Sequence, residues 1–106
     1  MSKLPIECGN GWLDIINACH NKLLEIDPNY KPVQIKEKFG GLRYYYQSSG
    51  GDDRLERDDK MMVIVSYYEK KSLSICEMCG EPGTTDRIHG WIKTLCETHF
   101  KERNGA

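Results

Sequence analysis

Apolar side chains in the first third of the chain recur with the spacing of an amphipathic helix. They fall at Trp12, Ile15, Ile16, Cys19, Leu23 and Ile26, which is the i, i+3, i+4, i+7 pattern. The segment DPNYKP follows, and its two prolines predict the end of this helix. Cys19 lies on the apolar stripe, so we expect a small buried thiol there, and Cys8 is expected to be an inert thiol.

The pattern changes to a period of two in VQIKEKFGGLRYYYQ, residues 33–47. The Gly40-Gly41 pair can supply the positive φ angles of a two-residue turn, so the sequence predicts a β-hairpin from Val33 to Gln47. That turn implies the cross-strand pairs Phe39–Leu42, Lys38–Arg43, Glu37–Tyr44, Lys36–Tyr45 and Ile35–Tyr46. The core-directed face would carry Ile35, Phe39, Leu42, Tyr44 and Tyr46.

The other face of this hairpin is predicted to be wet, basic and aromatic. It carries Lys36, Lys38, Arg43 and Tyr45, a combination that suits phosphates and unstacked bases. A simple solvated strand face with snorkelling lysines is the alternative. Glu37 is a misfit on the core-directed face, and we expect either a hydrogen-bonded structural partner for its carboxylate or an acid in a ligand pocket.

The segment SSGGDDRLERDDK, residues 48–60, reads as a polar loop that runs into a helix start. The following MMVIVSYYEKKS fits both a helix and a strand, and its charged flanks favour a second helix over the strand alternative. The Met and Tyr residues in this segment are expected in the core.

Two pairs of soft ligands dominate the last third of the chain. Cys76 and Cys79 form a Cys-x2-Cys pair, and Cys96 and His99 form a Cys-x2-His pair, with sixteen residues between the two pairs. Zinc prefers thiolate and imidazole ligands delivered as two close pairs, and Gly80 suits a tight knuckle after the first pair. A Cys-x-x-Cys redox centre is the rival, but it needs a βαβ setting and no second pair.

The residues between the two pairs predict a short hairpin. Pro82-Gly83 and His89-Gly90 are turn signals, and CETHFKER continues as a helix. Knuckle, hairpin and helix in this order are similar to treble-clef zinc modules. His89 is expected as a turn residue, with an alternate ligand or a contact for an anionic partner as the other interpretations, and Trp91 is expected to pack beside the zinc.

Composition and charge narrow the class of protein. The chain has 106 residues, 39% of them hydrophobic and 29% charged, which suits one domain (1–106) with an α/β-hairpin part at 1–73 and a zinc module at 74–106. Its formal net charge of −1 weakens the simplest nucleic-acid argument, although residues 31–47 hold four cations and one carboxylate. MSKLPIECGNGW lacks a signal-peptide pattern and no membrane-length apolar run occurs, so we expect a cytoplasmic protein with reduced cysteines.

Four good ligands would fill the coordination shell of the metal. A catalytic zinc usually has three protein ligands and one open position, so we expect one structural Zn²⁺ and no enzymatic activity. A treble-clef nuclease is the enzymatic alternative, because His89 could act as its general base. Nothing in CETHFKERNGA clearly supplies the separate metal-holding residues that such a nuclease needs.

Three segments together carry a resemblance to a known set of proteins: GWLDIINACHNKL, VQIKEKFGGLRYYY and CEMCGEPGTTDRIHGWIKTLCETH. Over residues 11–99 the chain resembles small, mostly uncharacterised proteins of bacteria and their phages. This resemblance implies a fold more than an activity, and it suggests a phage or prophage accessory protein that acts on a host system.

The sequence therefore predicts an α+β fold with an N-terminal helix, a β-hairpin, a second helix and a C-terminal treble-clef-like zinc module. The expected function is a non-enzymatic binding protein that acts in the host cytoplasm as an inhibitor or adaptor of a host protein. The alternative is a nucleic-acid or nucleotide-binding module that uses the basic-aromatic hairpin face. The candidate contact residues are Lys36, Lys38, Arg43, Tyr45, His89 and Trp91.

Overall fold

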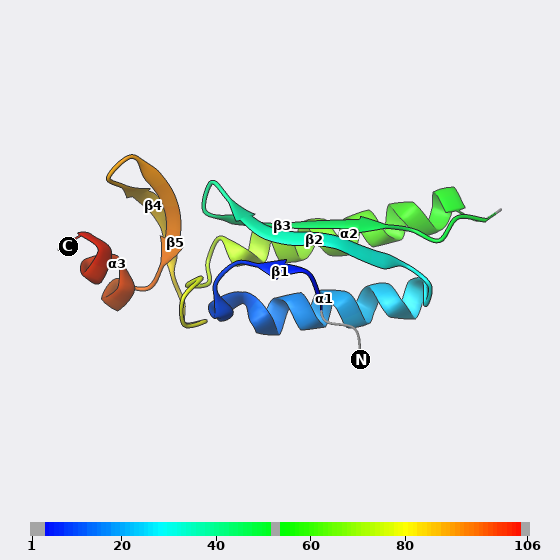
Figure 1. Cartoon of the computed structure of the whole chain (residues 1–106), viewed down its shortest axis with the longest axis horizontal. Helices are drawn as coiled ribbons and strands as arrows, with labels where there is room; N and C mark the ends of the chain where they lie inside the picture. Colours follow the sequence, from blue (N-terminus) through cyan, green and yellow to red (C-terminus); the bar gives the residue numbers. More distant parts are fainter. Residues whose placement is uncertain (1–3, 52–53, 105–106) are drawn as a thin grey trace.

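The computed structural model describes residues 4–51 and 54–104 (Figure 1). The elements are β1 (Ile6–Glu7), a 3-10 turn (Asn10–Trp12), α1 (Leu13–Ile26), β2 (Lys31–Lys38), β3 (Gly41–Gln47), α2 (Arg54–Ser72), β4 (Thr84–Ile88), β5 (Trp91–Leu95) and α3 (Glu97–Asn104). This order confirms the predicted α+β fold. The molecule is elongated, with a longest dimension of 54 Å, and the C-terminal module lies at one end.

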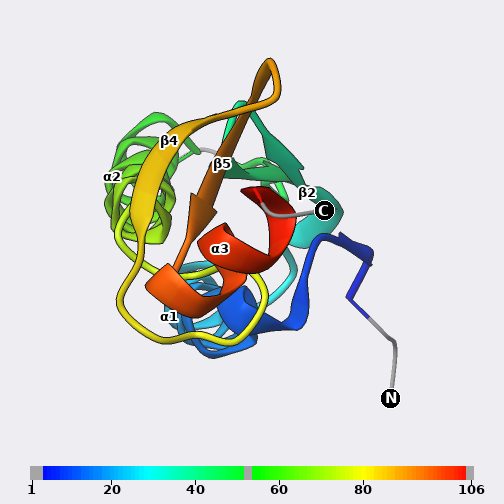
Figure 2. The same cartoon turned by 90° about the vertical axis from the view of Figure 1, so that its left-hand side faces the viewer.

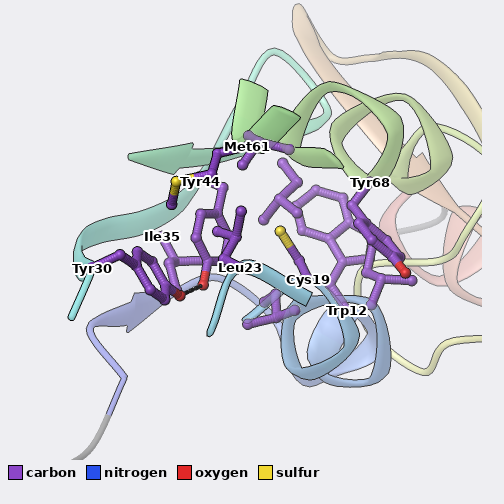
Figure 3. Packing of buried hydrophobic residues seen from close by; sticks show 12 residues of the cluster. Trp12, Cys19, Leu23, Tyr30, Ile35, Tyr44, Met61 and Tyr68 are labelled. Carbon is purple, nitrogen blue, oxygen red and sulfur yellow. Dashed lines mark hydrogen bonds between the residues drawn. The ribbon is translucent and has the colours of Figure 1, made fainter. Parts of the chain in front are cut away.

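A three-stranded sheet and two helices form the larger part of the molecule. The strand order is β1-β2-β3, with β1 parallel and β3 antiparallel to β2. One face of the sheet packs against α1 and α2, and side chains from all three meet in a single core that contains Trp12, Cys19, Leu23, Tyr30, Ile35, Tyr44, Met61 and Tyr68 (Figure 3). The predicted stripe is buried at Trp12, Ile15, Ile16, Cys19 and Leu23, and its last member, Ile26, is partly buried against the same core.

The β2–β3 hairpin has a different turn from the predicted one. Lys38 pairs with Gly41, so the turn residues are Phe39 and Gly40, with φ angles of 54° and 83°. Both angles are positive, as a two-residue type I′ turn requires. The turn lies one residue earlier than predicted, so each cross-strand partner moves by two residues and Ile35 lies opposite Tyr44 rather than Tyr46. The prediction of a buried Phe39 is wrong, because its side chain is 65% exposed.

Three contacts at Gly40 explain this register. The Gly40 amide donates to the Glu37 carboxylate at 2.8 Å, and the Gly40 carbonyl accepts from Thr94 Oγ1 at 2.6 Å. A Cβ at Gly40 would lie 3.0 Å from Ile92 Cγ2. The turn therefore needs glycine at this position, and Phe39 takes the other left-handed position as a consequence.

The second helix is confirmed, and it begins earlier than the sequence indicated. Residues 54–60, predicted as a loop, form the first turns of α2, while Asp52 and Asp53 lie outside the described residues. Met61 and Tyr68 are buried as expected. Their neighbours Met62 and Tyr67 are 57% and 56% exposed, so the prediction that the Met and Tyr residues of this segment lie in the core is wrong for these two.

The C-terminal part forms a second, two-stranded sheet followed by a short helix. β4 and β5 pair antiparallel from Thr84–Leu95 to Ile88–Trp91, and the turn residues are His89 and Gly90, with φ angles of 48° and 86°. His89 is therefore a turn residue, as predicted. Ile88 and Leu95 form a small core with Cys76, against which Phe100 of α3 packs. Figure 2 shows α3 in front of this two-stranded sheet.

Candidate metal centre

Four potential metal ligands converge between the second sheet and α3. Cys76 and Cys79 belong to the turn before β4, Cys96 follows β5 directly, and His99 lies in the first turn of α3. The Gly80 amide donates to the Cys76 carbonyl at 2.9 Å, and Gly80 has a φ of 85°. This tight turn brings the first two sulfurs to the same side of the loop.

The distances between the four ligand atoms are close to the edge lengths of a small tetrahedron. All four lie within 4.8 Å of one another. Cys79 Sγ is 3.7 Å from Cys96 Sγ, and His99 Nδ1 is 3.5 Å from Cys76 Sγ and 3.2 Å from Cys96 Sγ. A tetrahedral site with metal–sulfur bonds near 2.3 Å has sulfur–sulfur edges of about 3.8 Å. The predicted group of four ligands is therefore assembled, and it could hold one metal ion.

The backbone around Cys76 favours its thiolate. Burial of the sulfur opposes ionisation, but hydrogen bonds from the amides of Cys96, Cys79 and Met78 outweigh it and lower the pKa of Cys76 to about 6. Such amides offset negative charge on a metal-ligating sulfur. The hydrogen bonds of His99 to the Cys96 and Cys76 sulfurs raise its pKa above the ordinary value.

The neighbouring sulfurs oppose the ionisation of Cys79. The Glu81 amide favours the Cys79 thiolate, but desolvation and the adjacent Cys76 and Cys96 sulfurs outweigh it and raise its pKa to about 11. Closely spaced thiolates repel each other, and a divalent cation between them removes that repulsion. The donor set of three sulfurs and one imidazole thus favours a bound cation, and zinc is the divalent metal it suits best.

The two remaining cysteines do not belong to this site. Burial, with Glu77 and Glu37 nearby, raises the pKa of Cys8 to about 11. Burial and Glu69 raise the pKa of Cys19 to about 12. All five cysteines are free thiols, and the high pKa values of Cys8 and Cys19 fit the expectation of inert side chains.

The first turn of the metal centre docks on the N-terminal segment CGNGW. The Gly11 amide donates to the Glu77 carbonyl at 2.7 Å, and the Gly9 amide donates to Glu77 Oε2 at 2.9 Å. Trp12 Nε1 donates to the Ile75 carbonyl at 2.9 Å. A Cβ at Gly11 would lie 2.1 Å from the Cys76 carbonyl oxygen, so glycine is required for this approach. The loop that carries Cys76 and Cys79 is therefore packed directly against the N-terminal edge of the main core.

An ion-pair cluster joins the metal module to the β2–β3 hairpin. Lys93 Nζ lies 3.1 Å from Glu37 Oε1 and 3.9 Å from Glu77 Oε1. The three side chains are between 11% and 19% exposed. The structural interpretation of Glu37 is confirmed, because its carboxylate holds the hairpin turn and pairs with Lys93.

The candidate contact residues of the hairpin occupy the sheet face that the helices leave uncovered. Lys36 Nζ lies 5.8 Å from the Tyr45 ring centroid, and Tyr45 is 45% exposed. Arg43 pairs with Lys36 across the two strands. Within the described residues, the ion pairs involve none of Lys36, Lys38 and Arg43. Lys36, Arg43 and Tyr45 lie together on this face, and none of the four hairpin residues belongs to the ligand cluster.

His89 and Trp91 lie at the far end of the β4–β5 hairpin from the ligands. Neither belongs to the metal cluster, and Trp91 is 70% exposed, so the expected packing of Trp91 is wrong. The sequence also did not indicate the exposed Phe39 or the exposed apolar positions of α2. Only the short spacing of Gly9 and Gly11 could have signalled the close approach at the N-terminus.

Neither a family model, nor a curated protein, nor a solved structure matches this chain. Membership of the set of bacterial and phage proteins suggested by the motifs therefore stays a prediction, and its confirmed part is the C-terminal ligand cluster. Across residues 4–51 and 54–104, no helix has both the length and the apolar character needed to cross a membrane.

Proposed function

We propose that the chain is a non-enzymatic, zinc-stabilised binding protein, encoded by a phage or prophage and acting on a protein of its host in the host cytoplasm. The motif resemblance supports the phage origin. The Cys76, Cys79, Cys96 and His99 cluster supports one structural Zn²⁺, since four ligands leave no open position for substrate or water. A metal content below half an equivalent, with unchanged melting after chelation, would contradict this role of the metal.

The exposed face of α2 is the observation that carries the protein-binding proposal. Four large apolar side chains there are mostly exposed: Leu55 at 76%, Val63 at 70%, Met62 at 57% and Tyr67 at 56%. Large apolar side chains gathered on one exposed surface mark interaction sites more often than isolated ones do. Tyr and Met are also enriched in protein interfaces.

The surroundings of this face indicate the chemistry of the partner. A groove of about 370 Å³ lies beside Val63 and Tyr67, and Lys22 of α1 forms part of its lining. Lys71 Nζ lies 5.6 Å from the Tyr67 ring centroid. An apolar centre with this lysine rim fits a partner surface that is apolar in the middle and acidic at its edge.

Val63→Glu tests this proposal, with Gln47→Glu as the matched control for added charge on an exposed strand position. Both proteins should fold, because Val63 and Gln47 are exposed. We expect the host protein that co-purifies with the wild type to be lost with Val63→Glu and retained with Gln47→Glu. Capture of the same protein by both variants would contradict a role for α2, and concentration-dependent dimers abolished by Val63→Glu would assign the face to a second copy.

Nucleic-acid or nucleotide binding on the uncovered sheet face is a second candidate function. The cations Lys36, Lys38 and Arg43, which form no ion pair within residues 4–51 and 54–104, favour it, and Lys36 lies over the Tyr45 ring. Reversing the charge of Lys38 and Arg43 should weaken binding to RNA, DNA or nucleotides and reduce its salt dependence. Unchanged binding in a folded double variant would exclude this role of the face. The treble-clef nuclease is the least supported alternative.

A further inference from the structure

The turn of the β2–β3 hairpin packs against the β4–β5 hairpin, and a cleft of about 480 Å³ lies between the two hairpins. Figure 1 and Figure 2 show the turn of the β2–β3 hairpin beside the β4–β5 hairpin. Lys38 and Phe39 line one wall, and Arg87, Trp91 and Ile92 line the other. This volume lies within the range of about 300–1,000 Å³ that small-molecule sites occupy.

The walls of this cleft are held in fixed positions. Thr94 Oγ1 donates to the Gly40 carbonyl at 2.6 Å, and Gly40 packs against Ile92 and Thr85. The Lys93–Glu37 ion pair, at 3.1 Å, bridges the same two hairpins. A cleft that is already formed loses little entropy when it binds a ligand.

Two large aromatic side chains at the cleft are exposed to solvent. Phe39 is 65% exposed and Trp91 is 70% exposed. Phe39 also has a φ of 54°, a left-handed conformation that is uncommon for a bulky residue. Exposure and backbone strain both cost stability at Phe39, and such residues are concentrated at functional sites.

The charges at the cleft are complementary to an anion. The Arg87 guanidinium and the Lys38 ammonium form no ion pair within the described part of the chain. Lys38 Nζ lies 5.5 Å from the Phe39 ring centroid, so cation and ring are adjacent. Glu37, the acid that lines the cleft, is already neutralised by Lys93 and by the Gly40 amide.

We propose that this cleft binds an unpaired nucleobase together with its phosphate. The base stacks on Trp91 and Phe39, and Arg87 and Lys38 contact the phosphate. Stacking needs an accessible ring face, which a base inside a duplex does not offer, so the ligand is a free nucleotide or a nucleotide in a single strand. The site shares Lys38 alone with the sheet-face proposal and nothing with the α2 face, so the three are tested separately.

The test measures fluorescence anisotropy of a fluorescein-labelled oligothymidylate at low salt. Trp91→Ala and Phe39→Ala should each weaken binding about tenfold, the scale of one lost base–aromatic stack. Arg87→Ala should weaken binding and lower its salt dependence. Arg54→Ala is the matched control, because it removes an exposed cation from the first turn of α2, which lies at the other end of the molecule, and it should bind as the wild type does.

Competing ligands identify the source of the base. Thymidine monophosphate that displaces the oligomer at equal nucleotide concentration supports a free nucleotide as the natural ligand, and oligomer binding without such displacement supports a single strand. Reversal of Arg43 alone, which lies outside the cleft lining, should leave Trp91-dependent binding intact and so separates this site from the sheet face. No binding of either probe, equal binding of a duplex, or wild-type affinity in both Trp91→Ala and Phe39→Ala would overturn the proposal.

Discussion

Gly11→Ala should uncouple the metal centre from the N-terminal part of the core. An alanine Cβ would lie 2.1 Å from the Cys76 carbonyl oxygen and 2.6 Å from the carbonyl carbon of Glu77. Contacts of Cβ atoms below 3.0 Å are essentially never observed, so the ligand loop must move by about 0.9 Å. The obstructing atoms belong to the backbone, which cannot rotate away as a flexible side chain would.

The expected loss of stability follows from the contacts that this movement breaks. The Gly11–Glu77 hydrogen bond at 2.7 Å and the Trp12–Ile75 hydrogen bond at 2.9 Å would both be lengthened. Each such bond contributes about 1 kcal/mol, and overpacking in a close contact costs about 1–3 kcal/mol. We therefore expect the free energy of unfolding to fall by about 3 kcal/mol.

Urea denaturation followed by tryptophan fluorescence measures this loss. Trp12 is fully buried and Trp91 is mostly exposed, so the change in emission on unfolding reports chiefly on Trp12. Gly41→Ala is the control, since its nearest new contact is the end of the Leu73 side chain at 3.2 Å, and it should cost less than about 1 kcal/mol. If Gly11→Ala is no less stable than Gly41→Ala, the docking argument is refuted.

Three further perturbations address the metal, the hairpin turn and the buried carboxylate. His99→Ala should abolish stoichiometric zinc binding and lower the melting temperature to that of chelator-treated wild type, because the binding energy of structural zinc is folding energy; metal analysis and calorimetry measure both. Phe39→Gly should stabilise the protein by about 1 kcal/mol in urea denaturation, because glycine adopts a φ of 54° without the steric cost of a side chain. Burial opposes the ionisation of Asp27, but hydrogen bonds from Ser49 and Asn29 and the charge of Arg57 outweigh it and lower its pKa below the ordinary value of 3.8. Its contribution to stability is therefore complete above that value and decreases as pH falls through the lowered pKa, and Asp27→Asn should remove this acid dependence from denaturation curves.

Each of these predictions has a specific contrary result. Full zinc content in His99→Ala would mean that the histidine is not a ligand. A destabilised Phe39→Gly would show that the ring contributes more packing than its 65% exposure suggests. An unchanged acid dependence in Asp27→Asn would assign that dependence to other carboxylates.

The ligand cluster was predictable from the sequence because its geometry is local. Each pair of ligands is close in sequence: one is a Cys-x2-Cys pair before a glycine, and the other is a Cys-x2-His pair at the start of a helix. In both pairs a single turn of the backbone brings the two donors together, so their spacing alone identifies all four residues. The helix α1 was equally accessible, since its apolar positions show one clear face. In α2 apolar residues occur on both faces, and the sequence could not tell the core-facing Met61 and Tyr68 from the exposed Met62 and Tyr67.

The features that the sequence did not reveal depend on contacts between distant segments. Phe39-Gly40-Gly41 allows two turn positions, and the observed one depends on Gly40 meeting Thr94 and Ile92 of the second hairpin. Gly9 and Gly11 are required by the Cys76 to Glu77 backbone, more than sixty residues away in the chain. Local propensity has no access to such requirements.

The docking of the ligand loop on Trp12 has a consequence for the order in which the chain folds. The hydrogen bonds of Trp12 and Gly9 to this loop span 63 and 68 residues, so they form only after the chain as far as Ile75 and Glu77 is available. Contacts of such long sequence separation slow folding. The segment that leads into α1 is thus synthesised before the partners of its hydrogen bonds. In a ribosome-bound chain that ends before Ile75, the Trp12 indole N–H has no Ile75 carbonyl to which it can donate.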